Sequence, residues 1–162
     1  HYILRNNEYS IIHFESPDLR GIDCAILYQS KKLDLLAMKA NKIDLPGRKT
    51  RDIVSATFTY RKDTFSVFVN HWPSRYGGRK KSNSKRQIAS ETLLHLMDST
   101  SKHHPNYKMI AMGDFNDEPS DSSLITLEKY SNRSEELKGT LKYKGRWQIF
   151  DQFICSKNFK NC

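Results

Sequence analysis

The sequence predicts a layered α/β domain built on a mixed β-sheet. Three short, nearly continuous apolar runs, at residues 23–28, 108–112 and 147–154, have the length and composition of buried strands. Residues 53–70 alternate between apolar and polar positions on both sides of a short polar turn, which predicts a β-hairpin. A helical pattern separates this hairpin from the next apolar run. Because hairpins and a helical crossover occur together, the sequence favours a mixed sheet over an all-parallel one.

The first half of the chain contributes strands and one long loop. Residues 9–14 form a short apolar run that predicts an edge strand, and residues 23–28 form a denser one. Residues 39–49 are polar and contain a Pro-Gly pair, which predicts a loop or turn. The hairpin then places one strand at residues 53–60 and its partner at residues 65–70.

The second half begins with a change to loop and helix patterns. Residues 73–78 contain a proline and two glycines, which predicts a loop. A helix is expected from about Ser84, with Asn83 or Ser84 as its cap, and a short one near Ser120 or Asp121. The apolar residues of the longer helix fall mainly on one face: Ile88, Leu93, Leu94, Leu96 and Met97.

Composition narrows the class of protein and of partner. The 162 residues have the mass of one ordinary domain, 18.9 kDa, with 37% hydrophobic and 28% charged residues. This balance excludes a disordered chain, and no stretch has the roughly 18 apolar residues of a membrane-spanning helix. The formal charge is +9, which favours an anionic partner but supplies no chemistry by itself.

A carboxylate and an amide follow directly after the apolar run 108–112. Asp114 and Asn116 lie two residues apart where the chain leaves the strand, so both side chains can point to the same side. Strand ends are where α/β folds place ligands, and these groups could bind a hard cation or position a water near a phosphate. The alternative is an Asx turn that only caps the next helix.

A second polar cluster follows the strand at residues 65–70. His71 could give or take a proton near pH 7, and Asn70 and Arg75 could contact phosphate oxygens. The alternative is a histidine that makes ordinary structural contacts. Two polar clusters at the ends of two buried strands favour a shared site over either cluster alone.

Six basic residues lie between Trp72 and Glu91 without an intervening acid. The functional interpretation is a surface that contacts a phosphate backbone, and the alternative is a solvated loop and first helical turn. Tyr76 is the only aromatic residue among them, which argues against a base-stacking platform. The six are Arg75, Arg79, Lys80, Lys81, Lys85 and Arg86.

The cysteines are three and widely spaced. No CxxC pair occurs among Cys24, Cys155 and Cys162, so a cysteine-based zinc site is not predicted. Buried thiols are the simplest interpretation. A Cys155–Cys162 bridge in an oxidising compartment is the alternative.

Three motifs at strand positions occur in a characteristic order: Asn70-His71-Trp72, Gly113-Asp114-Phe115-Asn116 and Phe150-Asp151-Gln152-Phe153-Ile154. Two further marks precede them, Arg20-Gly21-Ile22-Asp23 and Arg51-Asp52-Ile53. Together they resemble the endonuclease/exonuclease/phosphatase (DNase I-like) superfamily. The sequences of these motifs are most similar to a bacterial branch of secreted or periplasmic members, so we expect a secreted or periplasmic location.

The resemblance implies a four-layered α/β sandwich, in which two mixed sheets pack together between helices. It also implies hydrolysis of phosphoester bonds with Mg²⁺ or Mn²⁺. By position, His71 would be the general acid or stabilise developing charge, and Asp114 would orient or activate the attacking water. Asn116 would bind metal or phosphate, with Asp114 as the other metal ligand, and Asp151 would orient a later histidine.

The same resemblance leaves the substrate open. Asn70, Arg51 and Arg75 lie where contacts with phosphate are expected, and the positive charge slightly favours a nuclease acting on DNA or RNA. A phosphatase or a membrane-lipid substrate is the alternative within the superfamily, and no obligate protein partner is inferred. A different class of function is a non-catalytic module on the same fold that binds nucleic acid or another anionic surface.

Two features of the superfamily have no equivalent in residues 1–162. The first strands of these enzymes carry an asparagine and a metal-binding glutamate, and their last segment carries a catalytic histidine. We therefore expect residues 1–162 to be a single domain without its first strands and last catalytic segment. On its own, such a chain is expected to be inactive.

Overall fold

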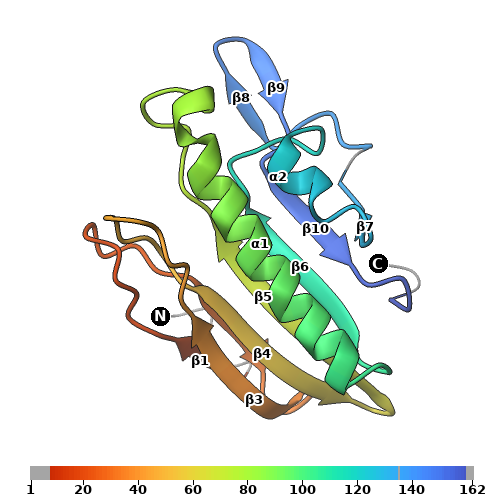
Figure 1. The fold of residues 1–162 in the computed structure, drawn as a ribbon. Coiled ribbons are helices and arrows are strands. Elements are labelled where there is room, and N and C mark those ends of the chain that lie inside the picture. Colours follow the sequence, from red (N-terminus) through yellow and green to blue (C-terminus); the bar gives the residue numbers. More distant parts are fainter. Residues whose placement is uncertain (1–7, 135, 160–162) are drawn as a thin grey trace.

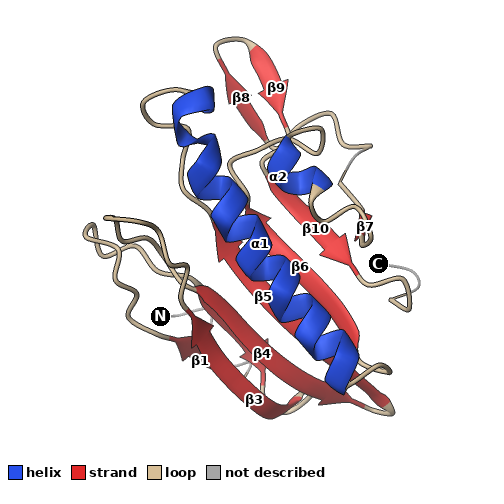
Figure 2. Cartoon of the chain, viewed as in Figure 1, coloured by secondary structure: helices blue, strands red, loops and turns tan. Residues whose placement is uncertain are grey.

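The computed structural model describes residues 8–134 and 136–159, which form one large sheet, two small hairpins and two helices (Figure 1). Helices α1 and α2 lie on the same face of the large sheet (Figure 2). In chain order the elements are β1 (Tyr9–His13), β2 (Ala25–Gln29), β3 (Asp34–Asn41), β4 (Ile53–Tyr60), β5 (Asp63–His71), α1 (Arg79–His103), β6 (Lys108–Asp114), α2 (Ser122–Ile125), β7 (Ser131–Asn132), β8 (Leu141–Tyr143), β9 (Arg146–Gln148) and β10 (Asp151–Cys155).

The large sheet is mixed, as the sequence predicts. Its strand order is β3-β4-β5-β6-β10-β7. A long loop between β3 and β4 and a short turn between β4 and β5 reverse the chain, so these three strands pair antiparallel. The long α1 crossover brings β6 back parallel to β5. Strand β10 then pairs antiparallel with β6. This arrangement brings the ends of β5 and β6 and the start of β10 to one edge of the sheet.

Apolar side chains pack on both faces of this sheet. Under the helices the core includes Trp72, Leu93, Met97, Phe115 and Leu127. On the other face, the β1–β2 hairpin covers a second apolar cluster that includes Ile12, Ile26, Val54, Phe58 and Val67. A groove of about 580 Å³ stays open between this hairpin and the sheet. The described residues therefore form a helix layer, a six-stranded sheet and one hairpin on the other face of that sheet.

One predicted loop and one predicted strand differ from the observed elements. The loop predicted for residues 39–49 is wrong at its start, because β3 extends to Asn41. Strand β3 is an edge strand with mostly exposed side chains, so it lacks the apolar pattern that identifies buried strands. The single strand predicted for residues 147–154 is also wrong, since β9 ends at Gln148 and β10 begins at Asp151.

Helix α1 begins at Arg79 rather than near Ser84. Its first turns hold polar residues that are buried instead of solvated: the Ser82 hydroxyl donates to the Gly78 carbonyl at 2.8 Å, and Arg86 donates to the Ser82 hydroxyl at 2.8 Å. Hydrophobic periodicity cannot detect a helix start that is stabilised by polar contacts. Within the described ranges, no helix is both long enough and apolar enough to cross a membrane.

Candidate active site

Three of the predicted catalytic residues form one row across the sheet. His71 on β5 is the register partner of Asp114 on β6, and Asp114 is the register partner of Asp151 at the start of β10. Register partners on neighbouring strands project to the same face, and His71 Nε2 lies 3.8 Å from Asp114 Oδ2. Both of these side chains are about one third exposed. Motifs that are 43 and 37 residues apart in sequence therefore meet in one place.

The His71–Asp114 pair is partly withdrawn from water. Burial lowers the pKa of His71, with the positive charge of Arg51 acting in the same direction and Asp114 opposing both. Burial also raises the pKa of Asp114, while the hydrogen bond from the Asn116 backbone opposes that rise. The negative charge of Asp151 adds to the increase. Titratable groups with such environments, placed at a strand end, are typical of functional sites.

The Asx turn and the ligand site, which the sequence presents as alternatives, share the same residues. The Asn116 backbone N–H donates to Asp114 Oδ1 at 2.8 Å, which is an Asx turn. The Asn116 side chain donates from Nδ2 to the Trp72 carbonyl at 2.9 Å. Its Oδ1 accepts no hydrogen bond from the described residues, and Asp114 Oδ2 faces His71. The turn therefore orients both groups and leaves one oxygen of each for a ligand.

The predicted phosphate contacts Asn70 and Arg51 have internal partners in the structure. Arg51 is 2% exposed, and it donates to the carbonyl oxygens of His71 and Trp72 at 3.0 and 2.9 Å and to Asp18 Oδ2 at 2.9 Å. Asn70 is equally buried and accepts a hydrogen bond from the Trp72 indole at 3.0 Å. These contacts fix the strand end that carries His71, which is a positioning role.

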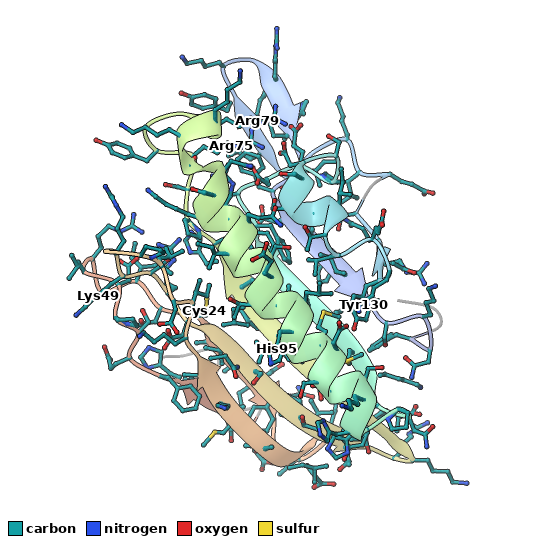
Figure 3. The ribbon with its side chains drawn as sticks, in the orientation of Figure 1. Cys24, Lys49, Arg75, Arg79, His95 and Tyr130 are labelled. Atoms are coloured by element: carbon teal, nitrogen blue, oxygen red, sulfur yellow. The ribbon has the colours of Figure 1, made fainter. Side chains whose placement is uncertain are left out.

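The six basic residues between Trp72 and Glu91, which we call the basic run, include three arginines that pair with two buried acids: Arg75, Arg79 and Arg86. Asp117 is fully buried, and its Oδ2 lies 2.6 Å from Nε of the equally buried Arg86, as an ion pair that is not aligned as a hydrogen bond. Arg75 lies 3.2 Å from Asp117 and 2.7 Å from Asp121. Arg79 also pairs with Asp121, and Figure 3 shows Arg75 and Arg79 together at the start of α1.

This network corrects the interpretation of the basic run. Three of its six residues form ion pairs with acids of the same chain. The three without an acidic partner in the described ranges are Lys80, Lys81 and Lys85. Sequence reasoning missed Asp117 and Asp121 as their partners. The available signal was Asp117, directly after the Gly113–Asn116 motif, and Asp121 four residues later, in a chain whose basic run has no acid of its own.

Replacing Asp117 with Asn should strongly destabilise the fold. The variant leaves two guanidinium groups without their shared carboxylate, one of them fully buried, and we expect a loss of about 3 kcal/mol in the free energy of unfolding. Urea unfolding measures it. Asp63→Asn is the matched control, because Asp63 pairs with Lys108 at an exposed site where about 1 kcal/mol or less is expected. Equal losses in the two variants would contradict the assignment.

Asp18 should make stability depend on pH. A hydrogen bond from the Arg20 side chain is the main cause that lowers the pKa of Asp18 to about 2, and Arg51 contributes to it. A carboxyl group whose pKa falls on folding stabilises the protein above its unfolded pKa, and this contribution is lost as pH decreases through the folded value. Asp18→Asn should therefore cost about 1 kcal/mol at neutral pH and almost nothing near pH 2. Urea unfolding across this range tests it, and a difference independent of pH would refute it.

Residues 1–161 match the family model described as the Endonuclease/Exonuclease/phosphatase family, so the chain belongs to that family. Among solved structures, it is similar to the human nocturnin catalytic domain with bound sulfate anion, with 17% identity and a TM-score of 0.74 over 97% of this chain and 64% of that one. It also resembles a mannosyl-6-phosphatase from Bacteroides thetaiotaomicron, with 17% identity and a TM-score of 0.70 over 93% and 63%.

Truncated TDP2 from Caenorhabditis elegans is a third similar structure, with 14% identity and a TM-score of 0.74 over 96% of this chain and 64% of that one. At these identities the similarity establishes the fold, which is DNase I-like. The chain spans just under two thirds of the length of the solved structures it matches. No curated protein matches it significantly.

Proposed function

We propose that the protein containing this chain is a divalent-metal-dependent phosphoesterase, with a nuclease favoured over a phosphatase. The observation that carries the proposal is the row formed by His71, Asp114 and Asp151 across three adjacent strands. The chain belongs to a family whose description names nucleases and phosphatases, which supports hydrolysis of phosphoester bonds. The preference for nucleic acid rests on the net charge of +9 and on three lysines without acidic partners in the described ranges: Lys80, Lys81 and Lys85.

The donor atoms of this row fit a hard cation. Asp114 and Asn116 offer oxygen atoms, which Mg²⁺ and Mn²⁺ prefer, and the exposed carboxylate of Asp151 lies on the neighbouring strand. Asp114 and Asn116 are the residues proposed to hold the ion. A bound cation would neutralise the phosphate oxygens and the leaving group.

The chain's own residues supply the remaining steps. Asp114 Oδ2 is proposed to accept a hydrogen bond from the attacking water and hold it in line with the phosphorus. His71 Nε2 is proposed to donate a hydrogen bond or a proton to the phosphate or leaving oxygen, where negative charge develops. Asp151 is proposed to orient a further histidine of the longer protein. Arg51, Asn70 and Trp72 keep the His71 strand end fixed.

Hydrolysis assays on the longest natural protein that contains this chain test the proposal. The substrates are DNA, sphingomyelin and a chromogenic phosphodiester, each with Mg²⁺, Mn²⁺ or a chelator. We expect turnover that requires metal, is highest on DNA and is lost in Asp114→Asn. Turnover that persists in chelator would contradict the proposed requirement for a divalent metal. Salt-dependent DNA binding without turnover would favour a binding module. The 162-residue chain, assayed beside it, is expected to be inactive.

A further inference from the structure

A groove of about 330 Å³ opens beside the strand end that carries His71. Its walls come from the loop before β2, the loop between β3 and β4, the loop after β5, and one residue of α1. Lys49 belongs to the β3–β4 loop, on the side of the molecule away from β10 (Figure 3). We call it the basic groove, because five of its lining side chains are cationic: Arg20, Arg48, Lys49, Arg51 and Lys85.

The charge of this groove is not balanced by its own walls. Asp18 is its only acidic residue, and that carboxylate is already engaged by Arg51 at 2.9 Å and by Arg20 at 3.2 Å. No acidic partner lies within ion-pair distance of Arg48, Lys49 or Lys85 in the described part of the chain. Positive charges that converge on one concave surface raise the local concentration of anions, so the groove is complementary to a polyanion.

The basic groove is joined to the candidate active site by Arg51. This side chain lines the groove and also donates to the carbonyl oxygens of His71 and Trp72 at 3.0 and 2.9 Å. The next two residues of the chain, Pro73 and Ser74, line the same groove. The basic groove therefore adjoins the strand end that carries His71.

We propose that the basic groove binds a second phosphate group of the substrate, one that is not hydrolysed. The inference deepens the proposed phosphoesterase function and rests on it. Its volume is near the lower end of the range for ligand pockets, about 300 to 1,000 Å³, so it accommodates roughly one phosphorylated unit. The substrate is therefore a phosphoester with at least two phosphates, as in a nucleic-acid strand or a small polyphosphorylated molecule.

The kinetic test compares two substrates that differ by one phosphate. A nucleoside 3′-(p-nitrophenyl phosphate) is assayed with and without a 5′-phosphate, using the same protein as above. We expect the 5′-phosphate to increase kcat/KM about tenfold in the wild type, as for a charged hydrogen bond at a partly exposed site. In the double variant Arg48→Gln/Lys49→Gln this advantage should disappear, while the substrate without the second phosphate is hydrolysed at an unchanged rate.

The matched control removes the same charge elsewhere. Lys39 and Lys62 are exposed, on β3 and in the β4–β5 turn, and neither lines the basic groove. Lys39→Gln/Lys62→Gln should keep the full tenfold advantage. If both double variants lose it equally, net charge explains the effect and the subsite is refuted. The subsite is also refuted if the wild type shows no advantage.

A binding measurement separates this proposal from the proposed function. Isothermal titration with a nucleoside 3′,5′-bisphosphate requires no catalysis, so it is informative even if no substrate is hydrolysed. We expect the Arg48/Lys49 variant to bind it about tenfold more weakly than the Lys39/Lys62 control. Equal affinities would overturn the subsite. A short single-stranded oligonucleotide and a sugar bisphosphate are titrated in parallel. The one whose affinity falls more in the Arg48/Lys49 variant identifies the natural source of the second phosphate.

Discussion

Gly113→Ala is expected to lower the free energy of unfolding by about 4 kcal/mol or more, an exceptional loss for one methyl group. A Cβ at this position would lie 2.0 Å from the carbonyl oxygen of Asn70, far inside van der Waals contact. The clash is with backbone on the neighbouring strand, so no side chain can rotate away from it. Gly113 also has a φ of +129°, which residues with a side chain rarely adopt. Urea and thermal unfolding measure the loss.

Gly47→Ala is the matched control for this prediction. Gly47 also has a positive φ, +64°, but a Cβ there would meet nothing within 4 Å. The control therefore isolates the cost of the left-handed backbone, which is about 1 to 2 kcal/mol. If the two variants are equally stable, the close approach of β6 to β5 at Gly113 is not what requires glycine. A shift of β6 that relieves the clash would also move Asp114 away from His71, so activity should fall with stability.

The approach of the two polar clusters could be predicted from the sequence. Each follows an apolar run, a helical pattern separates them, and a helix-length connection allows two strands to pair in parallel. Parallel pairing brings the ends of both strands to one edge of the sheet, where His71 and Asp114 are indeed register partners. The same logic covers Asp151, because its strand pairs with β6 from the other side.

The partners of charged residues could not be predicted in the same way. The sequence predicts that Arg51 and Arg75 contact phosphate. In the structure Arg51 is buried against Asp18, and Arg75 is paired with Asp117 and Asp121. These acids are 33, 42 and 46 positions away along the chain. Local periodicity reports which face of an element is buried, whereas an ion pair depends on how distant loops pack together. Residue type alone therefore overestimates the positive charge available to a substrate.

Trp72 explains how the candidate site is held together. Its backbone N–H donates to the Asp114 carbonyl at 2.9 Å, and its carbonyl accepts hydrogen bonds from Arg51 and Asn116, both at 2.9 Å. Its fully buried indole packs edge-to-face on Phe115, with ring centroids 4.7 Å apart. One residue thus links the strand ends that carry His71 and Asp114. Such preorganisation lets the two side chains act as a unit rather than independently.

His71→Gln and Asp114→Asn should each reduce kcat/KM of the protein that contains this chain about 10²- to 10⁴-fold, the range for loss of a positioned acid or base. Both changes keep side-chain size and hydrogen-bonding capacity, so stability should change by about 1 kcal/mol or less at these partly exposed positions. His95→Gln is the control, because His95 is exposed on α1 and has no place in the row. Steady-state kinetics with a saturating divalent metal and urea unfolding of each variant measure both quantities.

The double variant distinguishes a shared site from two separate effects. Residues that act in one step are strongly non-additive, because removing either one already disables the step. We therefore expect His71→Gln/Asp114→Asn to lose about as much activity as the more damaged single variant. If the losses multiply instead, each residue acts through an independent path, and the 3.8 Å approach of Nε2 to Oδ2 does not describe a catalytic pair. Near wild-type turnover in both single variants would remove the row from the mechanism altogether.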